Sequence, residues 1–240
     1  MRHQMQVVLA NSVLLLVMSQ IPSAAQDRPP VPPAPSMAPL AIQAERNRLE
    51  LAAHLVVPTV LTFAKVNAPA INCVFNTTCT VTVSDSVGNI PMPAGVTGTG
   101  RVQSRTFAAT AGSPGAGKTA YLYRVDMTQA VSDGEAPCVT DLAVDFGPVV
   151  KLQYDGSGPL DDGFVIVQGG LGSIGILEAL KSGNTITFTF SQPVCAGPTP
   201  GSGKTTFFFG LASASAPKAV TAKVGWPGLL PLNVAARAPN

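Results

Sequence analysis

Charged side chains are scarce in this chain of 240 residues. Asp, Glu, Lys and Arg make up 12% of it, about half their usual share in soluble domains. The 15 Lys and Arg nearly balance the 13 Asp and Glu, so the formal net charge at pH 7 is only +2. A protein that binds nucleic acid needs a basic field to meet the phosphates. The composition therefore predicts no nucleic-acid partner.

The chain also lacks an apolar run long enough to span a membrane, which needs about 20 residues. The apolar run Val7–Val17 is shorter than that and follows the basic residues Arg2 and His3. Pro22 and the small residues Ser23–Ala25 come next. This order is typical of a cleavable secretory signal, with a buried N-terminal helix as the alternative. We expect a signal peptide over residues 1–25 and a secreted or periplasmic, bacterial protein without a membrane span.

Histidine is almost absent, because only His54 follows the predicted signal. A Ser-His-Asp or Cys-His catalytic group would have to use this one residue. Its position ahead of the predicted strands makes it a poor candidate. A pair of carboxylates for glycoside hydrolysis stays open, and the candidates for it are Asp126, Asp133, Glu135, Asp141 and Asp145.

Aromatic residues that could bind sugars are few, with one Trp and three Tyr in the chain. Tyr121 and Tyr123 alternate on one predicted strand and so share a face. They could form a small sugar platform, but we expect them to pack in the core.

The chain has four cysteines, all beyond the predicted signal: Cys73, Cys79, Cys138 and Cys195. An even number in an exported protein indicates disulfides. We predict the pairs Cys73–Cys79, which is local, and Cys138–Cys195, which joins two predicted core strands. Parity along their runs places Cys79 and Cys138 toward the core, where such residues can join one sheet to another. Zinc is the rival, but five residues separate Cys73 from Cys79 and histidine is scarce.

The pattern along the chain predicts four segments. The signal peptide is followed by a Pro-rich linker over residues 26–40, a short helix over 41–58 and a β domain over 59–240. In the β domain short runs alternate with period two, and Asn184–Ser191 is the clearest of them. Further runs are Cys79–Val83, Val102–Phe107, Thr119–Met127, Cys138–Phe146, Val149–Tyr154, Phe164–Val167, Thr205–Leu211, Ala219–Val224 and Leu232–Ala236.

These runs predict an all-β fold, an antiparallel β-sandwich of about ten strands. Gly, Pro, Asn and Asp separate the runs at short intervals, which leaves no room for the helices of a parallel α/β sheet. Leu171–Leu180 is the only internal helix candidate, and Gly172 and Gly175 weaken it.

Residues Gly112–Thr119 (GSPGAGKT) match the phosphate-binding loop formally, and Pro200–Thr205 (PGSGKT) nearly repeats its end. That loop needs a helix directly after it, whose N-terminus meets the phosphates. Here strand-like residues follow Lys118 and Lys204. We therefore predict two turns between strands and no nucleotide-binding residues.

Residues Asp155–Asp162 (DGSGPLDD) resemble an acidic calcium loop in composition. Asp155, Asp161 and Asp162 are the candidate ligands, and calcium is the only cofactor that the sequence suggests. A surface turn between two strands explains the same residues.

The sequence favours an exported, non-catalytic domain that acts in binding or envelope structure through its surface loops. Its partner would be an unknown surface ligand or envelope component. The alternative is a carboxylate-dependent extracellular hydrolase of polysaccharide or a similar polymer.

Overall fold

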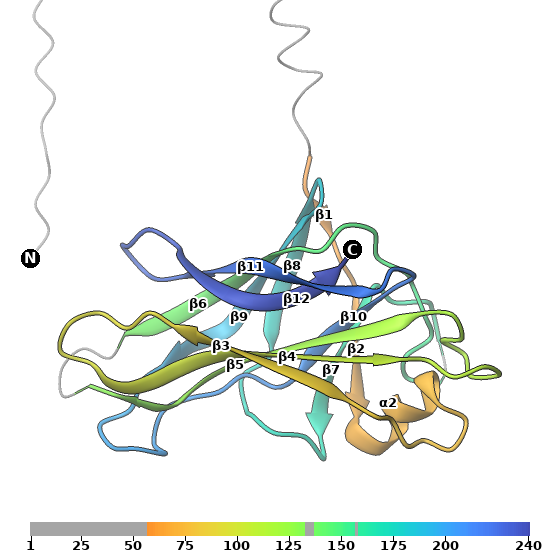
Figure 1. The fold of residues 1–240 in the computed structure, drawn as a ribbon, viewed down its shortest axis with the longest axis horizontal. Coiled ribbons are helices and arrows are strands. Elements are labelled where there is room, and N and C mark those ends of the chain that lie inside the picture. The colour runs from red at the N-terminus through yellow and green to blue at the C-terminus, as the bar shows by residue number, and fades with distance from the viewer. Residues whose placement is uncertain (1–56, 133–136, 157) are drawn as a thin grey trace, which may run out of the picture. The chain divides into compact units, whose positions relative to one another are not determined.

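The computed structural model describes residues 57–132, 137–156 and 158–240. The predicted signal peptide, the linker, His54 and nearly all of the helix predicted over residues 41–58 lie outside the described residues, as do Asp133 and Glu135. The described part is mostly β structure, in which two six-stranded sheets pack against each other (Figure 1).

We call the two layers sheet I and sheet II. Sheet I contains, from edge to edge, β1 (Thr59–Val60), β8 (Ile176–Ser182), β9 (Thr185–Cys195), β6 (Cys138–Asp145), β11 (Pro217–Gly225) and β12 (Leu232–Pro239). Sheet II contains β2 (Phe63–Asn67), β7 (Gly163–Gln168), β10 (Phe209–Ser213), β5 (Thr119–Val131), β4 (Thr97–Ala108) and β3 (Ser84–Ile90). Among the strands described here, only β2 and β7 pair in parallel. The predicted sandwich is confirmed, and the described residues form twelve strands and one short helix.

The main core lies between the sheets and follows the period-two pattern of the sequence. In β9, Ile186, Phe188 and Phe190 point inward, as the run Asn184–Ser191 predicted. The ring of Phe188 lies 4.8 Å from that of Phe209 on β10, centroid to centroid. Such contacts between inner faces are the main apolar contacts that hold a sandwich together.

A second, smaller core covers the outer face of sheet II. The helix α2 (Ala68–Phe75) packs there (Figure 1), with Phe75 fully buried against Phe107 and Phe164. Pro69 lies in the first turn of α2, where its missing N–H costs nothing. Because this core needs side chains from the outer face of β5, that strand is buried on both of its faces.

Two sequence predictions need correction. The run Cys79–Val83 is not a strand, because Cys79 has a positive φ of 57° in a turn and β3 begins only at Ser84. Val149–Tyr154 makes only isolated bridges. Leu171–Leu180, the weak helix candidate, is a loop followed by β8, since Gly172 (φ 100°) lies against the backbone of Thr206 and the segment after it pairs with β9.

The last strand, β12, crosses β3 at one side of the sandwich. A Cβ atom on Gly88 would lie 2.1 Å from the carbonyl oxygen of Ala235, so only glycine fits at this crossing. Nearby, the backbone N–H of Arg237 donates to Ser104 Oγ at 3.2 Å.

Among the described residues, no helix is both long and apolar enough to cross a membrane.

Candidate functional site

A cavity of about 380 Å³ opens beside α2 on the outer face of sheet II, and we call it the outer-face cavity. Its walls come from α2, from β4, β5 and β7, and from the loops around residues 81–83 and 169–171. Arg105 is the only charged residue of the lining. The other lining residues are Ala68, Asn72, Val81, Val83, Phe107, Leu122, Ile166, Gly169, Gly170, Leu171 and Phe208.

Arg105 is held in place from two directions. On β3, which pairs with β4, Asp85 accepts hydrogen bonds from Arg105 Nε at 2.9 Å and from Nη2 at 3.0 Å. The guanidinium carbon also lies 4.8 Å from the ring centroid of Phe208. The hydrogen bond from Arg105 lowers the pKa of Asp85, so the pair is ionised at neutral pH. Because Arg105 pairs with Asp85 through Nε and Nη2, the two N–H groups of its Nη1 stay outside the ion pair.

Behind Phe208 lies a second arginine, Arg124 on β5, which is 7% exposed. Its guanidinium carbon lies 5.2 Å from the centroid of the Phe208 ring. It pairs with the buried Asp126 at 3.1 Å, and Arg101 reaches the same carboxylate oxygen at 3.0 Å. Three arginines and two aspartates therefore gather on the outer faces of β3, β4 and β5, with an excess of one positive charge.

Burial acts to raise the pKa of Asp126. Hydrogen bonds from the side chain and backbone of Thr128 and from Arg101, with the charge of Arg124, outweigh burial and leave the pKa below its usual value. Burial lowers the pKa of Arg124, but an arginine stays charged at neutral pH. Its Nε has no hydrogen-bond partner among the described residues.

Two glycines that follow β7, Gly169 and Gly170, also line the cavity. Gly169 has a positive φ of 68°, which allows the chain to turn sharply after β7. A Cβ atom on Gly170 would lie 2.9 Å from Ile166 Cγ2. The backbone therefore runs directly against the apolar wall, and a side chain at position 170 would displace it.

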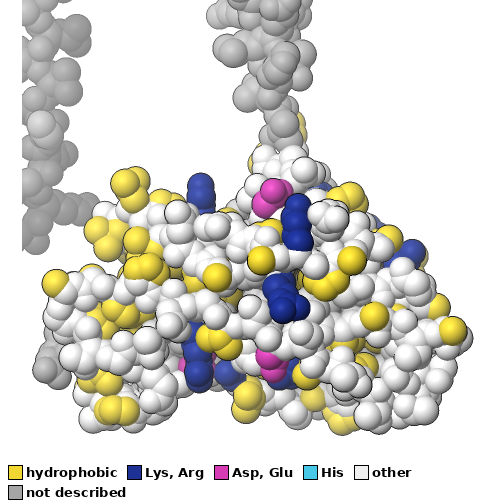
Figure 2. Space-filling view, viewed as in Figure 1, with side chains coloured by type: hydrophobic (Ala, Val, Ile, Leu, Met, Phe, Trp, Pro, Cys, Tyr) yellow, Lys and Arg dark blue, Asp and Glu magenta, His cyan; other side chains and the backbone are white. Residues whose placement is uncertain are grey.

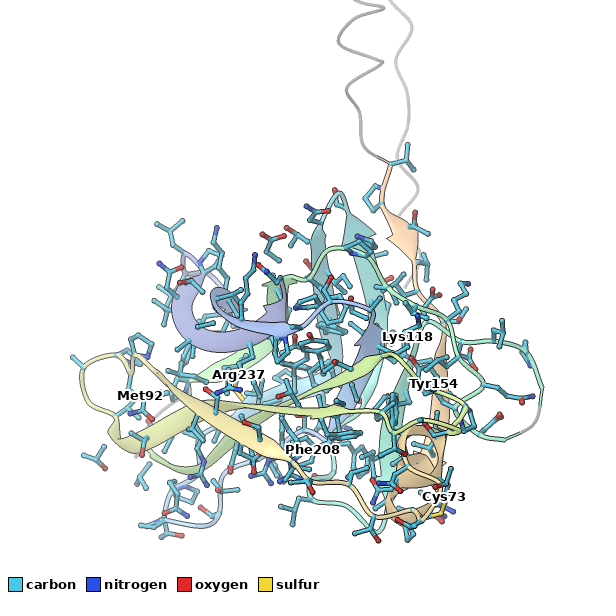
Figure 3. All side chains as sticks on the ribbon, turned by 45° about the vertical axis from the view of Figure 1, so that its right-hand side comes forward. Cys73, Met92, Lys118, Tyr154, Phe208 and Arg237 are labelled. Atoms are coloured by element: carbon cyan, nitrogen blue, oxygen red, sulfur yellow. A yellow bond between two sulfur atoms is a disulfide. The ribbon has the colours of Figure 1, made fainter. Side chains whose placement is uncertain are left out.

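Figure 3 shows Phe208 on the side of sheet II where α2 lies, with Cys73 of α2 labelled nearby. Figure 2 shows the Lys and Arg side chains of one face as separate groups, some of them beside Asp or Glu. Among the described residues, Arg105 is the one cation that lines the outer-face cavity.

The structure contains the disulfides Cys73–Cys79 and Cys138–Cys195, the two pairs that the sequence predicted. Their setting differs from the expectation. Cys79 is exposed, because it lies in a turn rather than on a strand. Cys138 and Cys195 lie directly opposite each other on β6 and β9. This disulfide therefore links two neighbouring strands of sheet I instead of joining the two sheets.

The three calcium candidates have different surroundings in the structure. Among the residues that the structure describes, no group of three or more His, Cys, Asp or Glu could hold a metal ion. Asp162 instead accepts hydrogen bonds from Thr62 N and Oγ1 and pairs with Lys151 at 3.3 Å. Asp155 lines a different cavity beside α2, whereas Asp161 bridges to Leu152.

Both GKT segments are loops that lead into β structure. After Lys118 the chain enters β5, and Thr205, which follows Lys204, forms a bridge to Asp126. The loop amides donate into the protein, since Gly115 N–H bonds to Val74 O at 2.7 Å. Lys204 N–H likewise bonds to Cys195 O at 2.8 Å.

Tyr121 and Tyr123 are fully buried in the main core, as expected, and form no sugar platform. Of the carboxylates considered for hydrolysis, Asp126 forms ion pairs with Arg101 and Arg124. Asp141 accepts a hydrogen bond from Thr140 Oγ1 at 2.9 Å, and Asp145 is exposed at the end of β6.

The sequence reasoning missed the outer-face cavity. One signal was present, because Arg101 and Arg105 on β4 and Arg124 on β5 are cations within runs of strand-forming residues.

Comparison with protein-family models, with curated proteins and with solved structures found no match for the chain.

Proposed function

We propose that the chain is an exported, non-catalytic binding domain whose ligand occupies the outer-face cavity. The single observation that carries the proposal is this cavity, whose volume of about 380 Å³ lies in the range of small-molecule sites. Its apolar walls surround one fixed charge at Arg105, a combination that is typical of binding sites. Two disulfides support a secreted or periplasmic location, because such bridges persist in oxidising compartments.

Catalysis by a carboxylate receives less support from the same residues. A general acid works best with a pKa raised toward neutrality, whereas the pKa of Asp126 lies below its usual value. Its carboxylate is also fixed by two arginines. Asp126 is therefore suited to hold Arg124 in place rather than to transfer protons.

The test is binding of Nile red, an uncharged apolar dye, to the purified full chain with its disulfides formed. We expect a saturable rise in fluorescence. Val83→Trp should abolish it, because Val83 is 39% exposed at the rim and a tryptophan there would fill the mouth.

Val87→Trp is the matched control, since Val87 is also exposed and does not line the cavity. It should bind the dye like the unmodified chain. The proposal fails if no saturable binding occurs, or if both tryptophan variants lose it equally.

A further inference from the structure

We propose that the ligand of the outer-face cavity is a small amphiphilic carboxylate, with its anion at Arg105 Nη1 and its hydrocarbon part on the apolar walls. This inference rests on the proposed function, because it names the class of ligand for the same cavity. It commits to a small molecule, since the cavity has the volume of a small-molecule site.

Charge selects the sign of the ligand. The lining contains one arginine and no aspartate or glutamate, so a cationic ligand would find no partner there. The arginines and aspartates on this side of sheet II, three and two in number, leave one positive charge in excess. An anion is therefore the complementary group, and Asn72 offers a further donor from α2.

Geometry prepares Arg105 for this role. Asp85 and the ring of Phe208 fix the guanidinium, so little side-chain entropy is lost when an anion binds. The planar fork of arginine suits a carboxylate, and hydrogen bonds between charged groups are stronger than neutral ones. The pair with Asp85 uses Nε and Nη2, which leaves Nη1 for the ligand.

The apolar part of the ligand follows from the remaining walls. Phe107, Leu122 and Phe208 are buried at the base of the cavity, and Leu171 is 59% exposed at its rim. A hydrocarbon chain that enters the cavity would contact these apolar side chains. Each buried CH₂ group contributes about 0.8 kcal/mol, so each added methylene should tighten binding about four-fold until the cavity is full.

The experiment is calorimetric titration of the full oxidised chain with butyrate, hexanoate and octanoate, and with 1-octanol and octylamine as uncharged and cationic counterparts. We expect affinity to rise along the carboxylate series. The affinity for octanoate should exceed that for 1-octanol by about ten-fold or more, because a hydrogen bond to a charged group contributes about 1.5 kcal/mol or more. Octylamine should bind more weakly than both.

Two variants test the role of Arg105. Arg105→Gln should lower the affinity for octanoate about ten-fold or more, a larger loss than the one it causes for 1-octanol. Asp85→Asn keeps Arg105 and leaves an amide oxygen that can still accept the hydrogen bond from its Nε, but it removes the exposed counter-charge, so octanoate should bind about two- to five-fold more tightly. This second variant keeps the test valid if Arg105→Gln fails to fold.

The outcomes separate the two proposals. If Nile red binds but octanoate binds no better than 1-octanol, the carboxylate is wrong and the binding cavity stands. If Asp85→Asn weakens octanoate binding, recognition at Arg105 is likewise wrong. If neither Nile red nor any member of the series binds, both proposals fall.

Discussion

The hydroxyl of Tyr123 in the centre of sheet II donates a hydrogen bond to the carbonyl oxygen of Arg237 on β12 of sheet I, at 2.7 Å. Tyr121, two residues earlier, donates in the same way to Ser215 O at 2.7 Å. Both rings are buried between the sheets. The hydroxyl group of each buried tyrosine thus adds a hydrogen bond to the apolar contacts between the sheets.

Tyr123→Phe should therefore destabilise the domain by about 1 to 3 kcal/mol, because it leaves the Arg237 carbonyl unpaired in the core. Urea denaturation at pH 7 measures the change. Tyr154→Phe is the control, since Tyr154 belongs to the smaller core on the outer face of sheet II, where its hydroxyl lies 3.4 Å from Val150 O. An equal loss in both variants would refute a special role for the contact between the sheets.

Alkaline pH should weaken the fold in a defined window. Burial raises the pKa of Tyr121 to about 12 and raises that of Tyr123 well above its usual value. Unfolded tyrosines ionise near pH 10, so the stabilisation is complete below pH 10 and is lost as the pH rises toward 12. Urea midpoints between pH 9 and 11.5 should fall less steeply for Tyr123→Phe than for the unmodified chain. Parallel slopes would contradict this assignment.

Asp126→Asn should destabilise the domain by about 3 to 5 kcal/mol, because it leaves the buried Arg124 without a counter-charge. Asp85→Asn, at an exposed pair, should cost no more than about 1 kcal/mol. Chemical denaturation of both variants measures the contrast. Equal effects would show that burial does not govern these pairs.

Asp126 should also govern how the stability of the domain declines at acid pH. The pKa of Asp126 is lowered in the folded state, so its stabilising effect is present above the usual pKa near 4 and is lost as the pH falls below it. The decline in stability below pH 4 should be shallower for Asp126→Asn. Unchanged steepness would assign the acid limit to other groups.

The two disulfides should contribute unequally to stability. Their cysteines are 57 and 6 residues apart, which corresponds to about 4 and about 2 kcal/mol in the chain-entropy model. Replacement of both Cys138 and Cys195 by alanine should therefore lower the melting temperature more than the same change at Cys73 and Cys79. Calorimetry compares the two double variants, and the reverse order would refute the model for this chain.

The GKT loops should not bind nucleotide, because their amides donate into the protein and β structure follows each loop. Lys204 is exposed and Lys118 is half-buried (Figure 3), so alanine at either position should change stability by no more than about 0.5 kcal/mol. Calorimetric titration with ATP and magnesium should show no micromolar binding. Saturable binding that disappears in Lys118→Ala would overturn this interpretation.

Periodicity predicted the strands that face one core, since β9 alternates Ile186, Phe188 and Phe190 with threonines. It failed where tertiary contacts decide the structure. The helix α2 has only eight residues, and its apolar side chains Ile71, Val74 and Phe75 form no long pattern. The pairing of the cysteines followed from their spacing, but their placement did not, because Cys79 lies in a turn.

The outer-face cavity could not be predicted, because its lining is assembled from segments between residues 68 and 208. Only the pairing of β4 with β5 and the packing of α2 bring Arg105, Leu122 and Ala68 to one place. No local pattern contains that information.

The crossing of β12 over β3 at Gly88 also bears on self-association. Exposed edges of β-sheets recruit strands from other chains and so start aggregation. Here β12 covers one edge of sheet II. At the opposite side the chain passes directly from sheet I to sheet II, as Leu61 N–H bonds to Ala179 O and Thr62 O accepts from Gly163 N–H. At these points, backbone groups that could pair with another chain are therefore covered or already bonded within the sandwich.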